Sequence, residues 1–300
     1  MIKLFEKVIS EHATAHLTDG NFCLSYLKFS TVTSGSGMND KVIFLVFKKN
    51  AHRPFLCLKT VRNYGAKHAV VRNFQNLQKL NTLTAGSPGE DLFSRAVYLH
   101  DDGENVFSIE TACQGSRIGK DVQKLMTVVE KYTMFQMHVA KQSKPHRSMQ
   151  ELASETIVKS GLNESDQRII LEYFEKLLPV DIKLPRIIQH GDLTPDNILW
   201  SRYGACIVDY DDVGNTDIPG YDLFNLLRRF SPIDFLKLRR EYFPLYFRKI
   251  GVNFTADKYE RLMFLYHFVE YIQKKSHNFE EISIKKIISN FESLRSKTER

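Results

Sequence analysis

Two short apolar segments that end in acidic residues constrain the fold of this chain more than any other feature. The first, residues 187–200, contains Asp192 and Asn197, and the second, residues 206–212, contains Asp209. Apolar runs of this length, separated by a short polar turn, predict two strands. We therefore expect these three side chains to meet at nearly one point, where the strands end.

This set of side chains suits phosphoryl transfer from a magnesium nucleotide. Asp192 would orient the attacking hydroxyl group, while Asn197 and Asp209 would supply oxygen ligands to Mg2+. Asp211 would face the same way as Asp209 on a strand and could support the metal. The spacing Asp-x-x-x-x-Asn is that of the catalytic loop in kinases. The alternative is a pair of buried strands with solvated acids at their ends.

Four motifs, in this order and spacing, resemble those of the aminoglycoside phosphotransferase and choline kinase family. They are His190-Gly191-Asp192-Leu193, Asn197-Ile198-Leu199, Val208-Asp209-Tyr210 and Tyr221-Asp222-Leu223. The resemblance implies an α+β, two-lobed protein-kinase-like fold, with an N-terminal antiparallel sheet lobe containing one helix and a larger, mostly helical C-terminal lobe. It also implies that Asp192 is the catalytic residue, and that His190 and Asp222 give the site structural support.

Small residues at a predicted hairpin turn point to phosphate binding. Gly35, Ser36 and Gly37 lie between two strand-like runs, and small residues there let backbone amides approach phosphates closely. In the resembled family this loop covers the nucleotide phosphates, although a plain turn explains the sequence equally well. Glu110 and Ala112 resemble that family's hinge, where backbone groups meet the adenine.

Lys59 ends a strand-like run, residues 55–59, as the lysine does in the Val-Ala-Ile-Lys pattern of kinases. A lysine at a buried strand end needs an anionic partner, and nucleotide phosphates would supply one. The alternative is an edge lysine that reaches solvent. In the next predicted helix, about residues 66–81, the family presents a glutamate to this lysine, but here Asn73 takes that place. No other carboxylate lies nearby in the sequence, so either Lys59 is held in another way or nucleotide handling is altered.

The hinge-like segment predicts a boundary near Gly115 between two lobes. Residues 1–114 would bind the nucleotide, and residues 115–300 would hold the catalytic and substrate-binding parts. Aromatic side chains of the second lobe would either wall a substrate pocket, by stacking on a sugar or holding a cationic group, or form an aromatic core. They include Phe243, Tyr246, Phe247, Phe264, Tyr266, Phe268 and Tyr271.

Positive charge is concentrated in one part of the chain. Residues 41–88 contain nine Lys or Arg side chains and no Asp or Glu, and the whole chain has a formal net charge of +7. A basic lobe facing an acidic catalytic loop suits a nucleoside triphosphate, but an ordinary solvated face explains the charges about as well. No helix-turn-helix, zinc-finger or RNA-binding motif occurs, so we expect no nucleic acid partner.

The four cysteines, Cys23, Cys57, Cys113 and Cys206, stand far apart in apolar runs. We expect reduced thiols in the core of a cytoplasmic protein. The longest apolar runs, such as residues 42–47, are too short to span a bilayer, so no stable membrane insertion is expected. The polar residues at the start of the chain interrupt any signal-peptide core.

The sequence thus predicts a phosphotransferase that uses ATP and Mg2+ to phosphorylate a hydroxyl group of a small molecule, for example a sugar or an amino alcohol. One alternative is a catalytically silent, kinase-like nucleotide-binding or regulatory module, which Asn73 favours. A protein kinase is a weaker alternative, because the interval from Asp209 to Asp222 is too short for a regulated peptide-docking loop.

Overall fold

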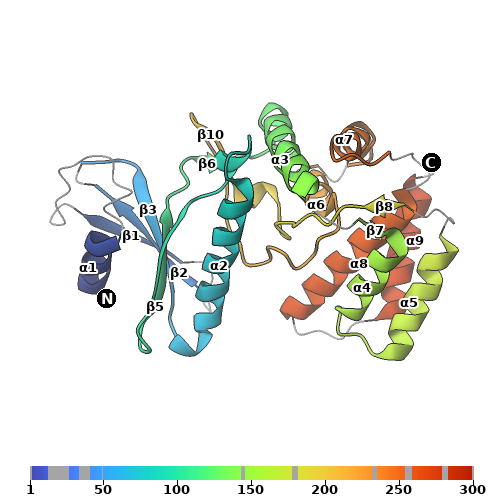
Figure 1. Ribbon diagram of the computed structural model, residues 1–300, viewed down its shortest axis with the longest axis horizontal. Helices are drawn as coiled ribbons and strands as arrows, with labels where there is room; N and C mark the ends of the chain where they lie inside the picture. Colours follow the sequence, from blue (N-terminus) through green and yellow to red (C-terminus); the bar gives the residue numbers. More distant parts are fainter. Residues whose placement is uncertain are drawn as a thin grey trace. The chain divides into compact units, whose positions relative to one another are not determined.

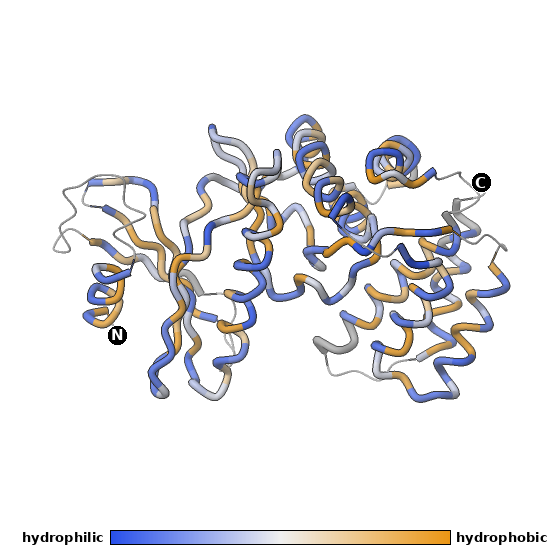
Figure 2. Tube along the Cα trace, viewed as in Figure 1, coloured by the Kyte–Doolittle hydropathy of each residue, from blue (hydrophilic) through white to orange (hydrophobic). Residues whose placement is uncertain are grey.

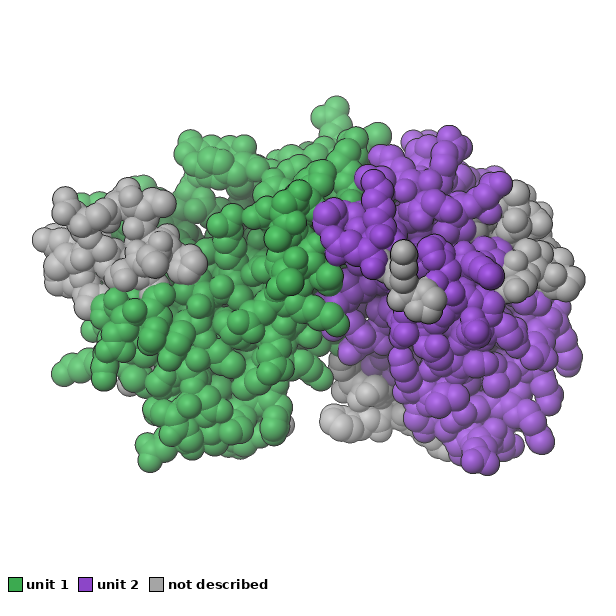
Figure 3. Space-filling view, in the orientation of Figure 1, with its two compact units in different colours: residues 1–135, 195–212 green, residues 136–194, 213–300 purple. Residues whose placement is uncertain are grey.

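The structure is a computed structural model that describes residues 2–12, 27–33, 41–48, 50–142, 146–177, 182–231, 235–253, 259–278 and 283–298. The chain forms two compact units, which Figure 3 shows in different colours. Unit 1 consists of residues 1–135 and 195–212, and unit 2 of residues 136–194 and 213–300. The boundaries of these units differ from those of the predicted lobes, residues 1–114 and 115–300. The lobes are defined by their expected functions and remain a prediction.

Unit 1 contains an antiparallel sheet of five strands in the order β1-β2-β3-β5-β4 (Figure 1). The strands are β1 (Lys28–Thr33), β2 (Lys41–Phe47), β3 (Pro54–Val61), β4 (Ala96–Asp101) and β5 (Val106–Thr111). The middle strand, β3, pairs with β2 and β5. Most of its residues are buried, as a short and almost continuous apolar run predicts. The predicted antiparallel sheet is confirmed.

Two helices cover opposite faces of this sheet: α1 (Ile2–His12) and α2 (Lys67–Thr84). Leu58 on β3 belongs to the hydrophobic core around Phe5 of α1, whereas the next residue, Lys59, donates a hydrogen bond to Asn73 of α2. Neighbouring residues of a strand point to opposite faces, so α1 and α2 lie on different sides of the sheet. Figure 2 shows that hydrophobic and polar residues both occur along these two helices.

A smaller sheet of unit 1 contains one strand from each of the two acidic segments. Its order is β10-β9-β6, with β6 (Ser116–Arg117), β9 (Ile198–Ser201) and β10 (Gly204–Ile207). Strands β9 and β10 form an antiparallel hairpin. The prediction of a strand that leads into Asp192 is wrong, because residues 187–192 form no strand and β9 begins only after Asn197. Gly115, just before β6, has a φ of +117°, and a Cβ atom there would lie 2.0 Å from the carbonyl oxygen of Trp200. Only glycine therefore allows the chain to pass so close to β9.

A disulfide joins Cys113 to Cys206 within unit 1, with their Cα atoms 5.7 Å apart. The expectation of reduced thiols is wrong for this pair. The two residues are 93 positions apart in the sequence, so their spacing gave no indication that they would meet. Cys57 is a buried free thiol. Its burial, and next the neighbouring Glu110 carboxylate, raise the pKa of the Cys57 thiol to about 12. Cys23 lies outside the described residues.

Unit 2 is built mainly from helices (Figure 1). They are α4 (Met149–Val158), α5 (Glu164–Lys176), α6 (Tyr221–Phe230), α7 (Phe235–Lys249), α8 (Tyr259–Asn278) and α9 (Ile284–Thr298), with a short sheet of β7 (Arg147–Ser148) and β8 (Lys183–Leu184). The helix α3 (Val122–Gln142) begins in unit 1 and ends in unit 2. The predicted helical character of this part is confirmed. Within the described part of the chain, none of the helices combines the length and the apolar character needed to cross a membrane.

The aromatic residues of unit 2 form its core. Of the seven side chains that could have walled a substrate pocket, six are at most 2% exposed, namely Phe243, Tyr246, Phe247, Phe264, Tyr266 and Phe268. Tyr266 donates a hydrogen bond to the carbonyl group of Pro219, and Tyr246 accepts one from the amide of Gly220. The pocket-wall interpretation is therefore wrong for these six, because they are buried in the core. The hydroxyl groups of the two tyrosines bind the loop before α6.

The disulfide makes a prediction that a thiol titration can check. In a Cys23→Ser variant, the unfolded chain should show one reactive thiol without reductant, that of Cys57, and three after reduction. In the native state Cys57 should not react at pH 8, because the thiolate is the reactive form and the thiol is buried with a raised pKa. Three thiols in the unreduced, unfolded chain would show that Cys113 and Cys206 are not joined.

Candidate active site

Lys59 is the central charged residue of unit 1. The residue is 5% exposed, and its Nζ lies 2.9 Å from Oε1 of Glu110 and 3.1 Å from Oδ1 of Asn73. It also lies 5.1 Å from the ring centroid of Tyr210. Burial is the largest single influence and lowers the pKa of this lysine, but Glu110, Cys57 and Tyr210 together raise it by more, so that the pKa lies above its ordinary value. Lys59 is therefore a charged, buried and oriented ammonium group.

The partner of Lys59 comes from the neighbouring strand. On β3 and β5, Lys59 pairs with Ser108 and Cys57 pairs with Glu110. Glu110 is thus the diagonal neighbour of Lys59 on one face of the sheet, within reach of a long side chain. Sequence reasoning missed this ion pair, because it looked for a carboxylate near Lys59 in the sequence. The predicted hinge role of Glu110 concerns its backbone and not its side chain. The ion pair does not test that role, which stays a prediction.

Ala112 was the second predicted hinge residue. It follows directly after β5, and its amide donates a hydrogen bond to the carbonyl oxygen of Phe55 at 3.0 Å. That bond ties the end of β5 to the start of β3 in the same sheet. The contact of Ala112 with adenine also stays a prediction. The residues of the predicted phosphate-binding turn, Gly35, Ser36 and Gly37, lie outside the described residues.

Asn73 connects Lys59 to the acidic segment after β10. Asn73 is completely buried, and while its Oδ1 accepts from Lys59, its Nδ2 donates to Oδ1 of Asp211 at 2.6 Å. The ammonium of Lys41, the first residue of β2, lies 2.5 Å from Oδ2 of Asp211 and 3.2 Å from Oδ1 of Asp209. A chain of polar contacts therefore runs from Glu110 through Lys59, Asn73 and Asp211 to Lys41. Every member belongs to unit 1.

The hairpin of β9 and β10 places Asn197 and Asp209 next to each other. Asn197 directly precedes β9, and its carbonyl oxygen accepts a hydrogen bond from the amide of Val208 at 2.9 Å. Asp209 is therefore the residue directly after Val208, whose amide is bonded to Asn197. It has a φ of +69°, a left-handed conformation that few non-glycine residues adopt and that is frequent at functional sites. Strand β10 ends at Ile207, so strand alternation does not explain why Asp211 lies near Asp209.

The donor atoms at this hairpin suit Mg2+. In the described part of the chain, no group of three or more His, Cys, Asp or Glu residues could hold a metal ion. Mg2+ does not require such a cage, because proteins usually bind it through one or two oxygen ligands while phosphates and water complete its shell. The carboxylates of Asp209 and Asp211 already hold one positive charge, the ammonium of Lys41. The side chains present therefore fit a hard cation.

Asp222 fixes the backbone of the catalytic-loop motif within unit 2. This fully buried residue accepts hydrogen bonds from the amides of His190 at 2.6 Å and of Gly191 at 2.9 Å. Its own amide donates to Oε1 of Gln189 at 3.1 Å. The carboxylate stands in the first turn of α6, where the helix dipole favours a negative charge. Asp192 follows directly after this double contact.

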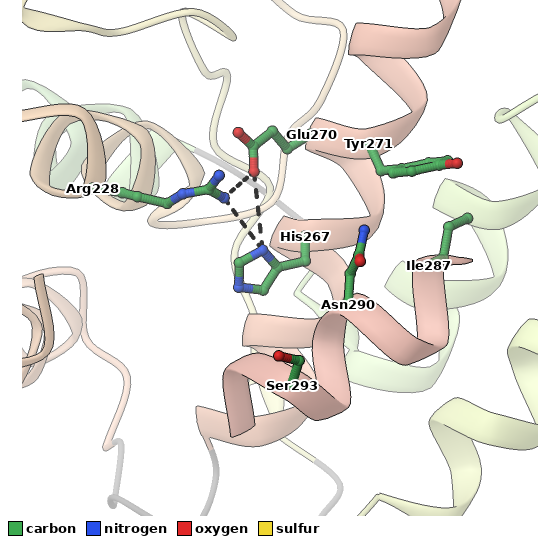
Figure 4. Close-up of a pocket in the computed structure, with 7 residues that line it drawn as sticks. All are labelled: Arg228, His267, Glu270, Tyr271, Ile287, Asn290 and Ser293. Atoms are coloured by element: carbon green, nitrogen blue, oxygen red, sulfur yellow. Dashed lines mark hydrogen bonds and ion pairs between the residues drawn. The ribbon is translucent and has the colours of Figure 1, made fainter. Parts of the chain in front are cut away.

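A cavity of about 330 Å³ lies among α6, α8 and α9 of unit 2 (Figure 4). It is lined by Arg228, His267, Glu270, Tyr271, Ile287, Asn290 and Ser293. The carboxylate of Glu270 forms an ion pair with Arg228 and lies near His267. Sequence reasoning did not identify this cavity, because its residues come from three helices. Its acidic and basic groups compensate one another, so the lining alone specifies no ligand class.

Comparisons with known proteins support the resemblance read from the motifs. Residues 130–264 match the model of the phosphotransferase enzyme family, and this range contains Asp192, Asn197, Asp209 and Asp222. The family resemblance is thereby confirmed over this part of the chain. No curated protein sequence matches the chain significantly.

Solved structures share the fold at low sequence identity. Choline kinase from Cryptosporidium parvum Iowa II has a TM-score of 0.58 and 11% identity, covering 99% of this chain and 96% of that one. A putative fructosamine-3-kinase from Haemophilus somnus 129PT has a TM-score of 0.55 and 12% identity, covering 96% of each chain. A thermostable mutant of aminoglycoside phosphotransferase APH(4)-Ia, solved with ADP and hygromycin B, has a TM-score of 0.54 and 10% identity, covering 83% of this chain and 88% of that one. These similarities confirm the predicted kinase-like fold.

The supporting role of Asp222 can be tested by substitution. Asp222→Ala should lower the free energy of unfolding by about 2–4 kcal/mol, because two buried amides lose a charged acceptor. Glu172→Ala is the control, since Glu172 is an exposed residue of the same unit whose ion pair with Arg168 lies at the surface, and it should change stability by less than about 0.5 kcal/mol. Equal effects of the two substitutions, measured by chemical denaturation, would contradict the role of Asp222.

Proposed function

We propose that this protein transfers the terminal phosphoryl group of ATP to a hydroxyl group of a small molecule. The observation that carries the proposal is the hydrogen bond between the amide of Val208 and the carbonyl of Asn197, which brings together the backbone segments of the two proposed metal ligands, Asn197 and Asp209. The match of residues 130–264 to a phosphotransferase family supports it. So does the fold shared with choline kinase and fructosamine kinase.

The nucleotide would bind to groups of unit 1. The buried ammonium of Lys59, oriented by Glu110, would bind phosphate oxygens of ATP. The turn containing Gly35, Ser36 and Gly37 would cover the phosphates, and backbone groups of Glu110 and Ala112 would meet the adenine. A lysine already held in place loses little conformational freedom when a phosphate arrives, so binding costs less ordering entropy.

Asn197 and Asp209 would hold the magnesium ion through their side-chain oxygens. When bound, Mg2+ neutralises negative charge on the phosphates, including the charge that develops during transfer. The left-handed backbone of Asp209 fixes where its carboxylate begins. Lys41, which contacts both Asp209 and Asp211, would balance the remaining negative charge of this segment.

Asp192 would accept or orient the proton of the attacking hydroxyl group. Its backbone follows the two amides that Asp222 anchors, so the position of its carboxylate depends on a buried and rigid support. His190 is 1% exposed, which favours a structural role for its ring over a role as general base. Asp222 would likewise support the loop through hydrogen bonds to its backbone and would take no part in the proton transfer.

The acceptor would be a sugar or an amino alcohol, by analogy with the substrates named for the similar structures, and the reaction would take place in the cytoplasm, where ATP is supplied. Six of the aromatic residues of unit 2 are core residues and therefore do not select the acceptor. The alternative remains a catalytically silent nucleotide-binding module. Transfer to an acceptor distinguishes the two.

Asp192→Asn tests the assignment of the catalytic residue. The variant should bind magnesium nucleotide about as tightly as the wild type, while the rate of phosphoryl transfer should fall by about 10²–10⁴-fold, the usual contribution of a general base. The assay is ATP consumption in the presence of sugars, amino alcohols or nucleosides, together with calorimetric titration of Mg–ADP.

Asp196→Asn provides a matched control from the same loop. Asp196 is exposed and its ion pair with Arg117 lies at the surface, so this variant should retain the transfer rate of the wild type. A wild-type rate in Asp192→Asn would overturn the assignment of Asp192. Binding of Mg–ADP by the wild type without transfer to any acceptor would favour the silent module.

A further inference from the structure

We propose that Glu110 and Asn73 are the positioning residues of Lys59, with Glu110 supplying the counter-charge and Asn73 a neutral link to Asp211. The proposal rests on the proposed function, in which Lys59 binds the phosphates of the nucleotide. It assigns to a strand residue the charge that the kinase pattern places on a helix. It also explains why the helix residue of this chain carries no charge.

The geometry shows that Glu110 satisfies the charge of Lys59 within one sheet. Both residues are at most 5% exposed, and their charged atoms are 2.9 Å apart. Because β3 and β5 are hydrogen-bonded neighbours, the distance between the two side chains is fixed by sheet register. The orientation of Lys59 therefore does not depend on a charged contact from α2.

The contacts of Asn73 require a neutral side chain with both a donor and an acceptor. Its oxygen accepts from Lys59 and its nitrogen donates to the Asp211 carboxylate at 2.6 Å. A carboxylate at position 73 could still accept from Lys59, but it would face Asp211 with no proton to donate. Two carboxylates at hydrogen-bond distance repel each other and resist ionisation together. A carboxylate at position 73 is thus unfavourable in this site, although many kinases have one at the corresponding helix position.

This arrangement makes a prediction opposite to the one that the kinase pattern makes. If Asn73 were simply a replacement that lost the charge of the kinase glutamate, then Asn73→Asp should improve nucleotide binding by restoring that charge. The contacts described here predict that Asn73→Asp weakens Mg–ADP binding about tenfold or more, because Asp211 is displaced from its position beside Asp209 and Lys41. Glu110→Gln should also weaken binding, because Lys59 loses the group that orients it.

A charge-conserving exchange separates positioning from general structural damage. In Asn73→Asp/Glu110→Gln the total charge around Lys59 equals that of the wild type, and Lys59 regains one carboxylate partner. The carboxylate at position 73 would still face Asp211, so the double variant should not regain wild-type affinity. It should bind Mg–ADP about as weakly as Asn73→Asp alone, because Lys59 again has a carboxylate partner and the loss of Glu110 then adds little. Glu90→Gln is the control, since Glu90 pairs with Arg95 at the surface of the same unit and its loss should leave binding unchanged.

The measurements are Mg–ADP affinity by calorimetry and KM and kcat for ATP, with unfolding transitions recorded for each variant. A loss of affinity in the double variant no greater than that of Asn73→Asp alone, with KM for ATP changing in parallel, supports the proposal. Additive losses in the double variant, or tighter binding by Asn73→Asp alone, would overturn it. Absence of phosphoryl transfer by the wild type, with Mg–ADP binding intact and non-additive losses in the double variant, would contradict the proposed function but not the positioning roles. Absence of Mg–ADP binding by the wild type would overturn both.

Discussion

A buried ammonium group needs a counter-charge, and the ion pair of Lys59 with Glu110 meets this need in the middle of unit 1. Removing water from a lysine side chain is costly unless a partner takes its place. Here the partner stands on the adjacent strand, 2.9 Å away, and keeps Lys59 charged. The neighbouring contacts follow from this pair, because Asn73 can be neutral only when Lys59 already has a carboxylate. The neutral Asn73 can in turn donate to Asp211 and hold the segment that carries Asp209.

The sequence predicts the elements of this arrangement better than it predicts their pairing. Apolar runs indicated the strands of the sheet and the β9–β10 hairpin, and the four motifs identified Asp192, Asn197, Asp209 and Asp222. The partner of Lys59 was missed because strand register is set by tertiary packing and not by local sequence. Glu110 lies on β5, which the chain reaches only after α2 and β4. The Cys113–Cys206 bond escaped prediction for a similar reason, since only the fold brings the segment after β5 next to β10.

Two backbone features, one in each unit, hold the main chain from which the candidate catalytic side chains extend. In unit 2, the Asp222 carboxylate accepts hydrogen bonds from the amides of His190 and Gly191 and so anchors the backbone directly before Asp192. In unit 1, the hydrogen bond after β10 and the left-handed φ of Asp209 set the direction of its side chain. Such preorganisation matters for phosphoryl transfer, where positioning and charge stabilisation supply most of the catalysis. The aromatic residues of unit 2 serve the loop before α6 in a similar way, through their buried hydroxyl groups.

The most direct test of the central ion pair is a double-mutant cycle on the free energy of unfolding with Lys59→Met and Glu110→Gln. Breaking a buried pair from one side leaves an uncompensated group, so each single variant should lose about 3–5 kcal/mol. The double variant leaves no such charge, and its loss should be smaller than the sum of the two by at least about 1.5 kcal/mol. Losses that simply add would show that Lys59 and Glu110 act independently, and would contradict the account.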